Sequence, residues 1–311
     1  MLWDDWLQRR LKLRDLRVLV AVADTKGMSK AAKRLNCSQP AVSKAISNLE
    51  RMLGQRLIER DRRGIELTPY GEALFRCSLA MFDDLRKGVA EMEFLSDPTV
   101  GAARIGCTEM VSAGIVSAVI IRLARRYPRI QFDLVQGRPA SLHRALDARD
   151  IDFMITRIVD PVDEHINIEI LFHERLVVAA RADHRCCRRR RIGLADLANE
   201  HWILPQPESY TSLLVTEAFR TSGLAAPQIA VVSPSPFIRL TLASSGHFIT
   251  VVTRSLLESN GKRFSIKALP IVLPGSRRPV GIVTLKNRAL SPVANLFVEH
   301  MRASAKSLGK A

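Results

Sequence analysis

The chain has 311 residues, 47% of them hydrophobic, and a formal net charge of +16. This length suggests about two domains with real apolar cores, and the charge favours a polyanionic partner. No apolar run reaches the roughly 18 residues of a membrane-spanning helix, no signal-peptide core follows Met1, and five cysteines without framework spacing fit a reducing cytoplasm.

The first part of the chain is predicted to be helical after an N-terminal extension over residues 1–12. An apolar helix is expected at Leu13–Ala23, and two short helices follow it, with a break at Asn36-Cys37 between them. Ser38 is the predicted N-cap of the second short helix, because a serine oxygen accepts a first-turn amide. Spacings of three and four give that helix one apolar face: Val42, Ile46, Leu49 and Leu53.

The opposite face of the second short helix carries side chains that can read DNA. Gln39 can pair with adenine, Lys44 with guanine, and Ser43 with base edges or phosphate, while Pro40 is tolerated in a first turn. A helix that presents this set at its N-terminal end suits a major groove. The alternative is a helical hairpin whose polar face is merely solvated.

A small β-hairpin is predicted next, with strands at Gln55–Arg60 and Ile65–Leu67. Three arginines lie around its tip: Arg60, Arg62 and Arg63. Such a wing could reach phosphates or a minor groove. The alternative for this segment is an exposed charged loop.

Several motifs in this region belong together: Ala31-Ala32 with Leu35, Ser38-Gln39-Pro40-Ala41-Val42-Ser43, Leu49-Glu50, Leu53-Gly54, Leu57-Ile58-Glu59-Arg60, and Leu67-Thr68-Pro69 with Gly71. In these motifs the chain resembles the winged helix-turn-helix of LysR-type transcriptional regulators, although Ile58 stands where the family usually has Phe. The resemblance implies contacts with base edges by the helix and with the backbone or minor groove by the wing. The expected DNA-binding residues are Ser38, Gln39, Pro40, Ser43, Lys44, Arg60, Arg62 and Arg63.

A long helix is predicted from Pro69 to about Leu95. Apolar or small residues recur along it at spacings of three or four, close to a heptad seam: Leu74, Cys77, Met81, Leu85, Gly88, Met92 and Leu95. We expect a dimerising linker at residues 71–97, following a winged domain at 1–70; the alternative is a helix packed on its own domain. A two-fold dimer would recognise an interrupted palindrome in double-stranded DNA.

From Ala102 onward, strands and helices alternate, which predicts an α/β fold with parallel strands. Strands are expected at 103–107, 130–135, 151–155, 168–180, 201–204, 228–232, 247–252 and 279–285, and helices at 110–127, 141–148, 209–222, 236–245 and 291–304. This half resembles the family's two-lobed, periplasmic-binding-protein-like effector domain. The resemblance implies a domain at 98–311, with lobe I at about 101–160 and 271–311, lobe II at about 161–270, and hinge segments near 156–165 and 265–274.

Ligands in open α/β sheets bind beyond the carboxyl ends of strands. The predicted effector-binding residues are Thr108, Glu109, Met110, Gln136, Ser209 and Phe248. The carboxylate of Glu109 would repel an anion, so we expect a neutral or cationic effector such as a sugar or polyol. A narrower resemblance to the sugar-responsive, galactose-binding-protein regulator type points the same way.

Neither a metal nor a cofactor is expected. His184 and Cys186-Cys187 match no structural zinc spacing, and five arginines from Arg185 to Arg191 would repel a cation, although they could also lower a thiol pKa. The favoured function is a ligand-responsive regulator, homodimeric or homotetrameric, whose effector changes the spacing of its heads and its contact with RNA polymerase. The alternatives are a sequence-indifferent architectural DNA-binding protein and an enzyme, although no catalytic constellation or phosphate loop supports the latter.

Overall fold

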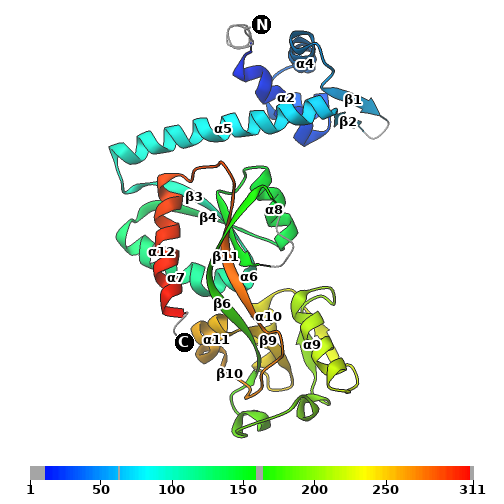
Figure 1. The fold of residues 1–311 in the computed structure, drawn as a ribbon, viewed down its shortest axis with the longest axis vertical. Helices are drawn as coiled ribbons and strands as arrows, with labels where there is room; N and C mark the ends of the chain where they lie inside the picture. Colours follow the sequence, from blue (N-terminus) through cyan, green and yellow to red (C-terminus); the bar gives the residue numbers. More distant parts are fainter. Residues whose placement is uncertain (1–10, 62–63, 159–163, 309–311) are drawn as a thin grey trace. The chain divides into compact units, whose positions relative to one another are not determined.

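The computed structural model describes residues 11–61, 64–158 and 164–308, so nearly all of the predicted N-terminal extension lies outside it. The chain divides into two compact units, residues 1–89 and 90–311 (Figure 1). Among the described residues, no helix is long and apolar enough to cross a membrane.

The first unit consists of three short helices, a β-hairpin and most of a long helix. Its elements are α2 (Leu13–Thr25), α3 (Met28–Arg34), α4 (Gln39–Leu53), β1 (Ile58–Asp61), β2 (Gly64–Leu67) and α5 (Pro69–Ser96). The core of this unit contains Leu16 and Leu19 of α2 together with Val42, Ile46 and Leu49 of α4, all almost fully buried. The predicted helix-turn-helix, hairpin and long helix are therefore confirmed.

The hairpin is attached to α4 through the Glu50 side chain. One carboxylate oxygen, Oε1, accepts hydrogen bonds from the backbone amides of Leu57 (2.9 Å) and Ile58 (3.4 Å). On the other strand, the amide of Ile65 donates to the carbonyl of Lys26 (3.2 Å). The side chain of Ile58 is half-buried against the core. The presence of Ile in place of the family's usual Phe is therefore a change of packing. These bonds fix the base of the hairpin beside α4.

The start of α5 packs directly against the segment that leads into the hairpin. Thr68 Oγ1 donates to the carbonyl of Arg56 (2.6 Å) and accepts from the amide of Gly71 (3.1 Å). A Cβ atom at Gly71 would lie 2.0 Å from the carbonyl oxygen of Leu57. Only glycine leaves room for this close approach of two backbones.

The apolar residues along the predicted seam of α5 differ in their exposure. Leu74 and Met81 are partly buried and pack against the core of the first unit, whereas Cys77, between them in the predicted seam, is exposed. The exposed apolar side chains come further along the helix: Leu85, Val89, Met92 and Leu95. Two of the seven predicted seam positions, Leu74 and Met81, thus contact the protein's own core, while the pairing of the seam with a second chain stays a prediction.

The second unit has two lobes that share strands. The first lobe contains β3 (Val100–Cys107), α6 (Glu109–Val111), η1 (Ser112–Val116), α7 (Ser117–Arg126), β4 (Arg129–Gln136), α8 (Pro139–Asp147), β5 (Phe153–Arg157), β11 (Arg277–Leu285) and α12 (Pro292–Leu308). The second lobe contains η2 (Arg185–Arg188), η3 (Leu194–Leu197), β7 (Trp202–Leu204), α9 (Tyr210–Thr221), β8 (Ile229–Val232), α10 (Pro236–Ala243), β9 (Ile249–Thr253), α11 (Arg254–Phe264) and β10 (Ile266–Ala268). Strand β6 (Ile166–Arg181) runs through both lobes.

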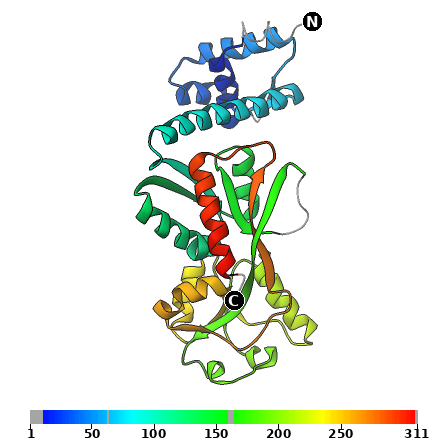
Figure 2. The same ribbon diagram turned by 60° about the vertical axis from the view of Figure 1, so that its left-hand side comes forward.

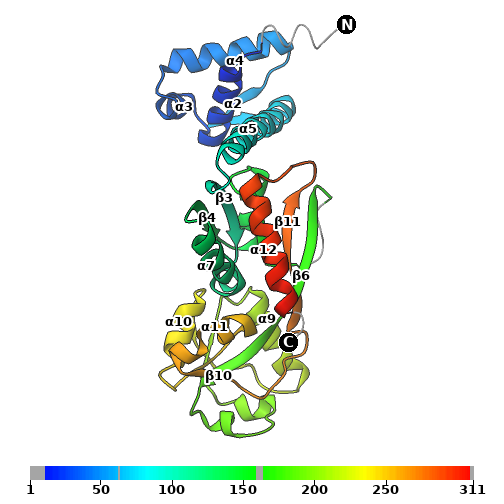
Figure 3. The same cartoon turned by 90° about the vertical axis from the view of Figure 1, so that its left-hand side faces the viewer.

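The strands are hydrogen-bonded in the order β4-β3-β5-β11-β6-β9-β7-β8, with β10 also paired to β6. Strand β3 is parallel to β4 and β5, and β7 is parallel to β8 and β9, as the alternating pattern predicted. Helix α12 packs on β3 and β6 and lies beside α7 (Figures 1 and 3). Each lobe has its own buried cluster, centred on residues such as Phe153 and Phe297 in the first lobe and Trp202 and Phe219 in the second.

The two lobes are joined by the antiparallel strands β6 and β11 (Figure 2). The first part of β6 pairs with β11, whereas Leu176 to Ala179 pair with β9. Glu174 lies opposite Arg278 where the strands cross between the lobes. The crossing strands lie further along the chain than the expected hinge segments at 156–165 and 265–274.

Two local features were not foreseen. The helix predicted over 110–127 is interrupted by the π-helical turn η1, where Gly114 has φ −98° and ψ −109°. A Cβ at Gly114 would lie 3.1 Å from Ser255 Oγ, so this turn packs closely against the second lobe. Helix α11 was missed because its sequence, RSLLESNGKRF, is polar, although Thr253 caps it through the amide of Leu256 (3.3 Å).

Candidate functional site

The predicted reading residues lie together at the start of α4. Gln39, Pro40 and Lys44 are exposed and Ser43 is half-buried, while the opposite face of the helix is in the core. Ser38 is the N-cap, and its Oγ accepts from the amide of Ala41 (3.4 Å). Its hydroxyl therefore caps the helix itself, while Gln39, Ser43 and Lys44, together with the apolar Pro40, form an open surface that is mainly polar.

The wing arginines lie at the edge of what the structure describes. The backbone of Arg60 is in β1, opposite Ile65, but its side chain is outside the described part. Arg62 and Arg63 also fall outside the described residues. Strand pairing ends with Asp61 opposite Gly64, which confirms a hairpin whose tip is at the predicted position.

The second candidate site is a cleft of about 330 Å³ between the two lobes. Five of the six predicted effector residues line it: Thr108, Glu109, Met110, Gln136 and Ser209. They come from the carboxyl ends of β3 and β4 and from the N-cap of α9. Thr108 is at the N-cap of α6 without a side-chain capping bond, whereas the Gln136 amide donates to Ser112 Oγ (2.6 Å).

Phe248 does not belong to this site, so that prediction was wrong. It comes immediately before β9, which begins at Ile249, and its ring packs against His201 and His247. Because β9 is parallel to β7, its N-terminal end lies at the opposite edge of the sheet from the cleft. The rule that ligands bind beyond carboxyl ends excludes this position, and it already does so for the predicted strand at 247–252.

Arg239 is the most deeply buried charged residue of the cleft, with 1% of its surface exposed. Its Nη1 donates to the carbonyls of Ser233 and Pro234, both at 2.9 Å, and its Nη2 lies 3.9 Å from Met110 Sδ. Its Nε is buried without a hydrogen-bond partner among the described residues. Burial lowers the pKa of Arg239 to about 10, so it remains charged at neutral pH.

Arg157, at the carboxyl end of β5, is the second cation of the cleft. Its guanidinium lies 5.1 Å from the centroid of the Tyr210 ring, and Arg278 lies 5.3 Å from the same ring. The Tyr210 hydroxyl donates to the carbonyl of Gly275 (2.5 Å) and accepts from Arg278 Nε (3.0 Å). Burial lowers the pKa of Arg157, and its buried Nη1 has no partner in the described part of the chain.

Glu109 carries the single carboxylate of the cleft lining, beside three arginines there, namely Arg138, Arg157 and Arg239. Its Oε1 accepts a hydrogen bond from Ser235 Oγ across the lobes (2.9 Å). Its charge also acts on Arg239, whose pKa it raises against the larger effect of burial. The carboxylate is therefore already engaged by the protein, and the net charge of the lining is positive.

Sequence reasoning missed Arg157 and Arg239, and at the start of α9 it selected Ser209 but not its neighbour Tyr210. Arg157 lies two residues after the predicted strand at 151–155, so the strand-end rule that gave Thr108 and Gln136 could have found it; the observed strand β5 ends at Arg157 itself. Arg239 lies in the otherwise apolar helix sequence PFIRLTLA, where a lone arginine signals either a buried role or an exposed face. Only the three-dimensional structure separates these two meanings.

The cysteine pair lies in the second lobe, away from the cleft lining. Cys186 is 1% exposed, and burial raises the pKa of both Cys186 and Cys187; at Cys186 it outweighs the opposing charges of Arg185 and Arg189. Arg185 is paired with Glu200 (2.7 Å). Within the described ranges, no group of three His, Cys, Asp or Glu side chains could hold a metal ion.

Comparison with known families gives two matches that together span most of the chain. Residues 13–72 match the bacterial regulatory helix-turn-helix protein, lysR family, and residues 96–306 match the LysR substrate binding domain.

Among characterised sequences, the chain is 31% identical over 302 residues to the HTH-type transcriptional regulator GbpR of Azospirillum brasilense (96% of this chain, 88% of that protein). It is 32% identical over 293 residues to the transcriptional dual regulator GltC of Bacillus subtilis (93% and 96%). Both relatives are named as transcriptional regulators, so neither the enzyme nor the architectural alternative is supported.

Solved structures agree on the fold. Full-length CbnR complexed with its target DNA superimposes with a TM-score of 0.61 at 24% identity, covering 94% of this chain and 100% of that one. Full-length OxyR from Pseudomonas aeruginosa gives a TM-score of 0.66 at 22% identity, covering 95% of each chain. A helix-turn-helix head followed by a two-lobed α/β domain is thus the shared architecture.

Proposed function

Because this chain belongs to the LysR family of transcriptional regulators, we propose that its effector is a small organic anion bound in the cleft between the two lobes. The family assignment makes the chain a DNA-binding regulator with an effector domain. The proposal adds the chemical class of the effector. It rests on one observation: Arg157 Nη1 and Arg239 Nε are buried donors in the cleft without hydrogen-bond partners in the described chain.

An unmatched buried donor on a charged group costs free energy, so a ligand that accepts from it binds with a corresponding gain. A carboxylate is the natural acceptor for a guanidinium, because its two oxygens match the planar donors. The polar groups of Thr108, Gln136 and Ser209 would hold the remainder of such a ligand. The cleft volume of about 330 Å³ suits a molecule of small-metabolite size.

This proposal replaces the expectation of a neutral or cationic effector, which rested on Glu109 considered alone. The carboxylate of Glu109 accepts from Ser235 and faces Arg239, so its charge is offset within the protein. Arg157 and Arg239 were not part of that expectation. With both included, the electrostatic preference of the cleft reverses toward anions.

An anion would also join the lobes. Arg157 belongs to the first lobe and Arg239 to the second, and the charge of Arg157 lowers the pKa of Arg239, so the two cations repel each other. An anion between them removes this repulsion and binds the closed arrangement more tightly than an open one. That difference in affinity is what shifts a conformational equilibrium.

The effector class can be tested by isothermal titration of the purified protein with two panels. The first contains acetate, benzoate, succinate and glutarate; the second contains galactose, arabinose, glycerol and inositol. We expect saturable binding within the carboxylate panel and none within the sugar and polyol panel. Saturable binding confined to the sugars would contradict the anion proposal and restore the earlier expectation.

For DNA, we propose that Gln39, Pro40, Ser43 and Lys44 face base edges, with Arg60, Arg62 and Arg63 of the wing on the backbone or minor groove. The open polar surface at the start of α4 supports the first group. The target would be an interrupted palindrome, read by two heads in the bacterial cytoplasm, where chromosomal DNA lies. Recovery of genomic fragments without a common sequence would contradict this assignment.

We further propose that the second half of α5 pairs with a second copy of the chain. Leu85, Val89, Met92 and Leu95 are each more than half exposed and recur at spacings of three and four. An apolar row of this kind is the pattern of a helix that buries one face against a partner helix.

Replacing Met92 by glutamate should weaken self-association at least tenfold. Burial of a methionine side chain contributes about 1.5–3 kcal/mol, and a charge there would have to be desolvated. Sedimentation velocity across a concentration series measures the effect. Glu93→Gln, a substitution at a neighbouring exposed position, is the control and should leave the self-association unchanged. If the Met92→Glu protein self-associates as strongly as the wild type, the proposed pairing is wrong.

A further inference from the structure

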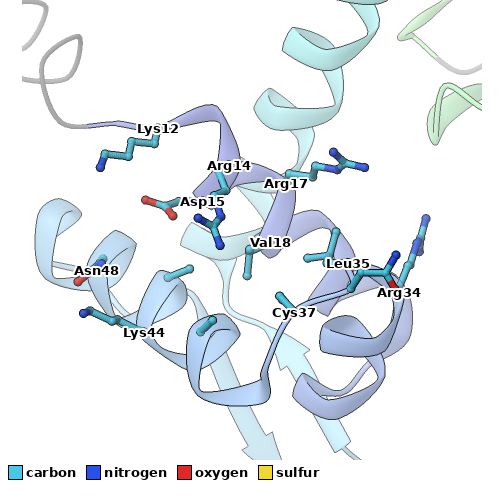
Figure 4. A pocket seen from close by; sticks show the side chains of 13 residues that line it. Lys12, Arg14, Asp15, Arg17, Val18, Arg34, Leu35, Cys37, Lys44 and Asn48 are labelled. Carbon is cyan, nitrogen blue, oxygen red and sulfur yellow. The ribbon is translucent and has the colours of Figure 1, made fainter.

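A basic groove lies beside the recognition helix in the first unit (Figure 4). It has a volume of about 530 Å³ and is bordered by the start of α2, the turn between α3 and α4, and one side of α4. Its charged and polar lining residues are Lys12, Arg14, Asp15, Arg17, Arg34, Asn36, Lys44 and Asn48. We call this the α2–α4 groove.

The charge of the α2–α4 groove is strongly positive. Five cations line it against the single carboxylate of Asp15. Arg34 is paired with Asp24 (2.8 Å), but the side chains of Lys12, Arg14, Arg17 and Lys44 are exposed and form no ion pair or hydrogen bond with any described residue. Exposed cations are often only solvated. Whether these cations bind a partner is therefore argued from their position beside α4.

The groove follows the side of α4 formed by Ala41, Lys44, Ala45 and Asn48. An α-helix with its side chains is about 10–12 Å across, and the DNA major groove is about 12 Å wide. A helix lying in that groove therefore has a phosphate backbone close along each side. Whatever borders α4 laterally must face one of these two backbones.

The opposite side of α4 provides a contrast. The cavity there is lined by Ser43, Ser47, Glu50, Arg56 and Glu59, so its two carboxylates outnumber its single cation. Phosphate contacts on that side would depend on the hairpin. The α2–α4 groove, in contrast, has its cations beside α4 itself.

We propose that the α2–α4 groove binds the sugar-phosphate backbone of the DNA strand that borders α4, with Arg14 and Arg17 as its principal phosphate contacts. This inference rests on α4 reading the major groove and adds a backbone clamp supplied by the first helix of the head. Both arginines of α2 line the groove; Arg14 extends toward the side of Lys44 and Asn48, whereas Arg17 extends toward the side of Arg34 (Figure 4). The clamp fixes the register of the head and carries no sequence preference of its own.

The test compares Arg14→Gln, Arg17→Gln and the double variant with the wild type, using an operator duplex selected from genomic fragments and a scrambled duplex of equal length. Dissociation constants are measured by fluorescence anisotropy over a range of salt concentrations. The logarithm of the DNA association constant falls linearly with the logarithm of the salt concentration. This slope should become shallower by about 0.9 for each arginine lost per head, on either duplex. The ratio of operator to scrambled affinity should stay the same, because phosphates carry no base information.

Three control variants make the test specific. Arg14→Lys keeps the charge and should retain most of the slope, whereas Arg76→Gln removes an exposed arginine of α5 and should not change it. Lys44→Ala should reduce the ratio between operator and scrambled affinity. An unchanged ratio for Lys44→Ala would refute base reading by Lys44, whereas the slopes of the arginine variants decide the groove proposal.

An unchanged slope in the double variant would overturn the groove proposal, as would a change in its operator preference. Both arginines are exposed, so substitution should alter the free energy of unfolding by no more than about 0.5 kcal/mol. A thermal melt of each variant checks this. If a glutamine variant melts early, Arg14→Ala and Arg17→Ala, which also remove the charge and favour the helix more, provide the measurement instead.

Discussion

Replacing Gly71 by alanine should lower the free energy of unfolding of the first unit by about 3 kcal/mol, at the upper end of the range for overpacked sites. The added Cβ would lie 2.0 Å from the carbonyl oxygen of Leu57 and 2.9 Å from its carbonyl carbon. Both atoms are backbone and cannot move aside as a side-chain end could. Relief requires separating the start of α5 from the hairpin, which also breaks the Thr68 hydrogen bonds to Arg56 and Gly71.

The matched control is on the same helix. At Gly88 no atom lies within 4 Å of an added Cβ, so Gly88→Ala should stabilise the protein by about 0.5–1 kcal/mol through helix propensity. Urea unfolding followed by circular dichroism measures both variants. DNA affinity should fall in Gly71→Ala, while carboxylate binding in the other unit persists. A Gly71→Ala protein as stable as the wild type would show that the backbone approach at Leu57 is looser than described.

The second large effect is expected at Arg239. Replacing it by methionine should weaken binding of the tightest carboxylate of the panel by at least about 2 kcal/mol, the usual loss when one partner of a buried charge pair is truncated. This corresponds to a dissociation constant raised roughly 30-fold. The reason is that Arg239 is buried, charged at neutral pH and has an unmatched Nε in the cleft. Isothermal titration gives the affinity directly.

Arg239 also holds the carbonyls of Ser233 and Pro234, so its removal could disturb the fold of the second lobe. Arg157→Gln provides the independent measurement, because the described structure records no side-chain hydrogen bond for Arg157. It should weaken the same carboxylate in the same direction. Arg220→Met, on the exposed face of α9 beside Glu217, should leave the affinity unchanged. Full carboxylate affinity in both cleft variants would refute the anion proposal.

The sequence predicted best where periodicity and chain direction decide the structure. The face of α4 with Val42, Ile46 and Leu49 follows from spacing alone, because a helix with that pattern has one side to bury. The cleft residues Thr108 and Gln136 followed from the carboxyl ends of parallel strands. Phe248 fails the same rule, because both the predicted strand at 247–252 and β9 itself place it at the amino end.

Other errors came from contacts that are distant in sequence. Leu74 and Met81 satisfy a heptad pattern equally well whether they face a second chain or their own core. The sequence around Arg239 does not indicate that this residue is buried. Its burial depends on the turn at Ser233 and Pro234, whose carbonyls accept hydrogen bonds from its guanidinium. The charge balance of the cleft depended on side chains from β5 and α10, which no local pattern brings together, so reasoning from Glu109 alone chose the opposite ligand class.

The crossing of β6 and β11 has a consequence for how such a protein can change. Every element of the second lobe lies between these two strands in the sequence, and Glu174 and Arg278 mark neighbouring entry and exit points in one ladder. The second lobe is therefore a continuous insertion whose two ends are adjacent in space. The second lobe of another protein could therefore be inserted between Glu174 and Arg278. This would replace the cleft residues contributed by the second lobe while the sequence of the helix-turn-helix unit stays the same.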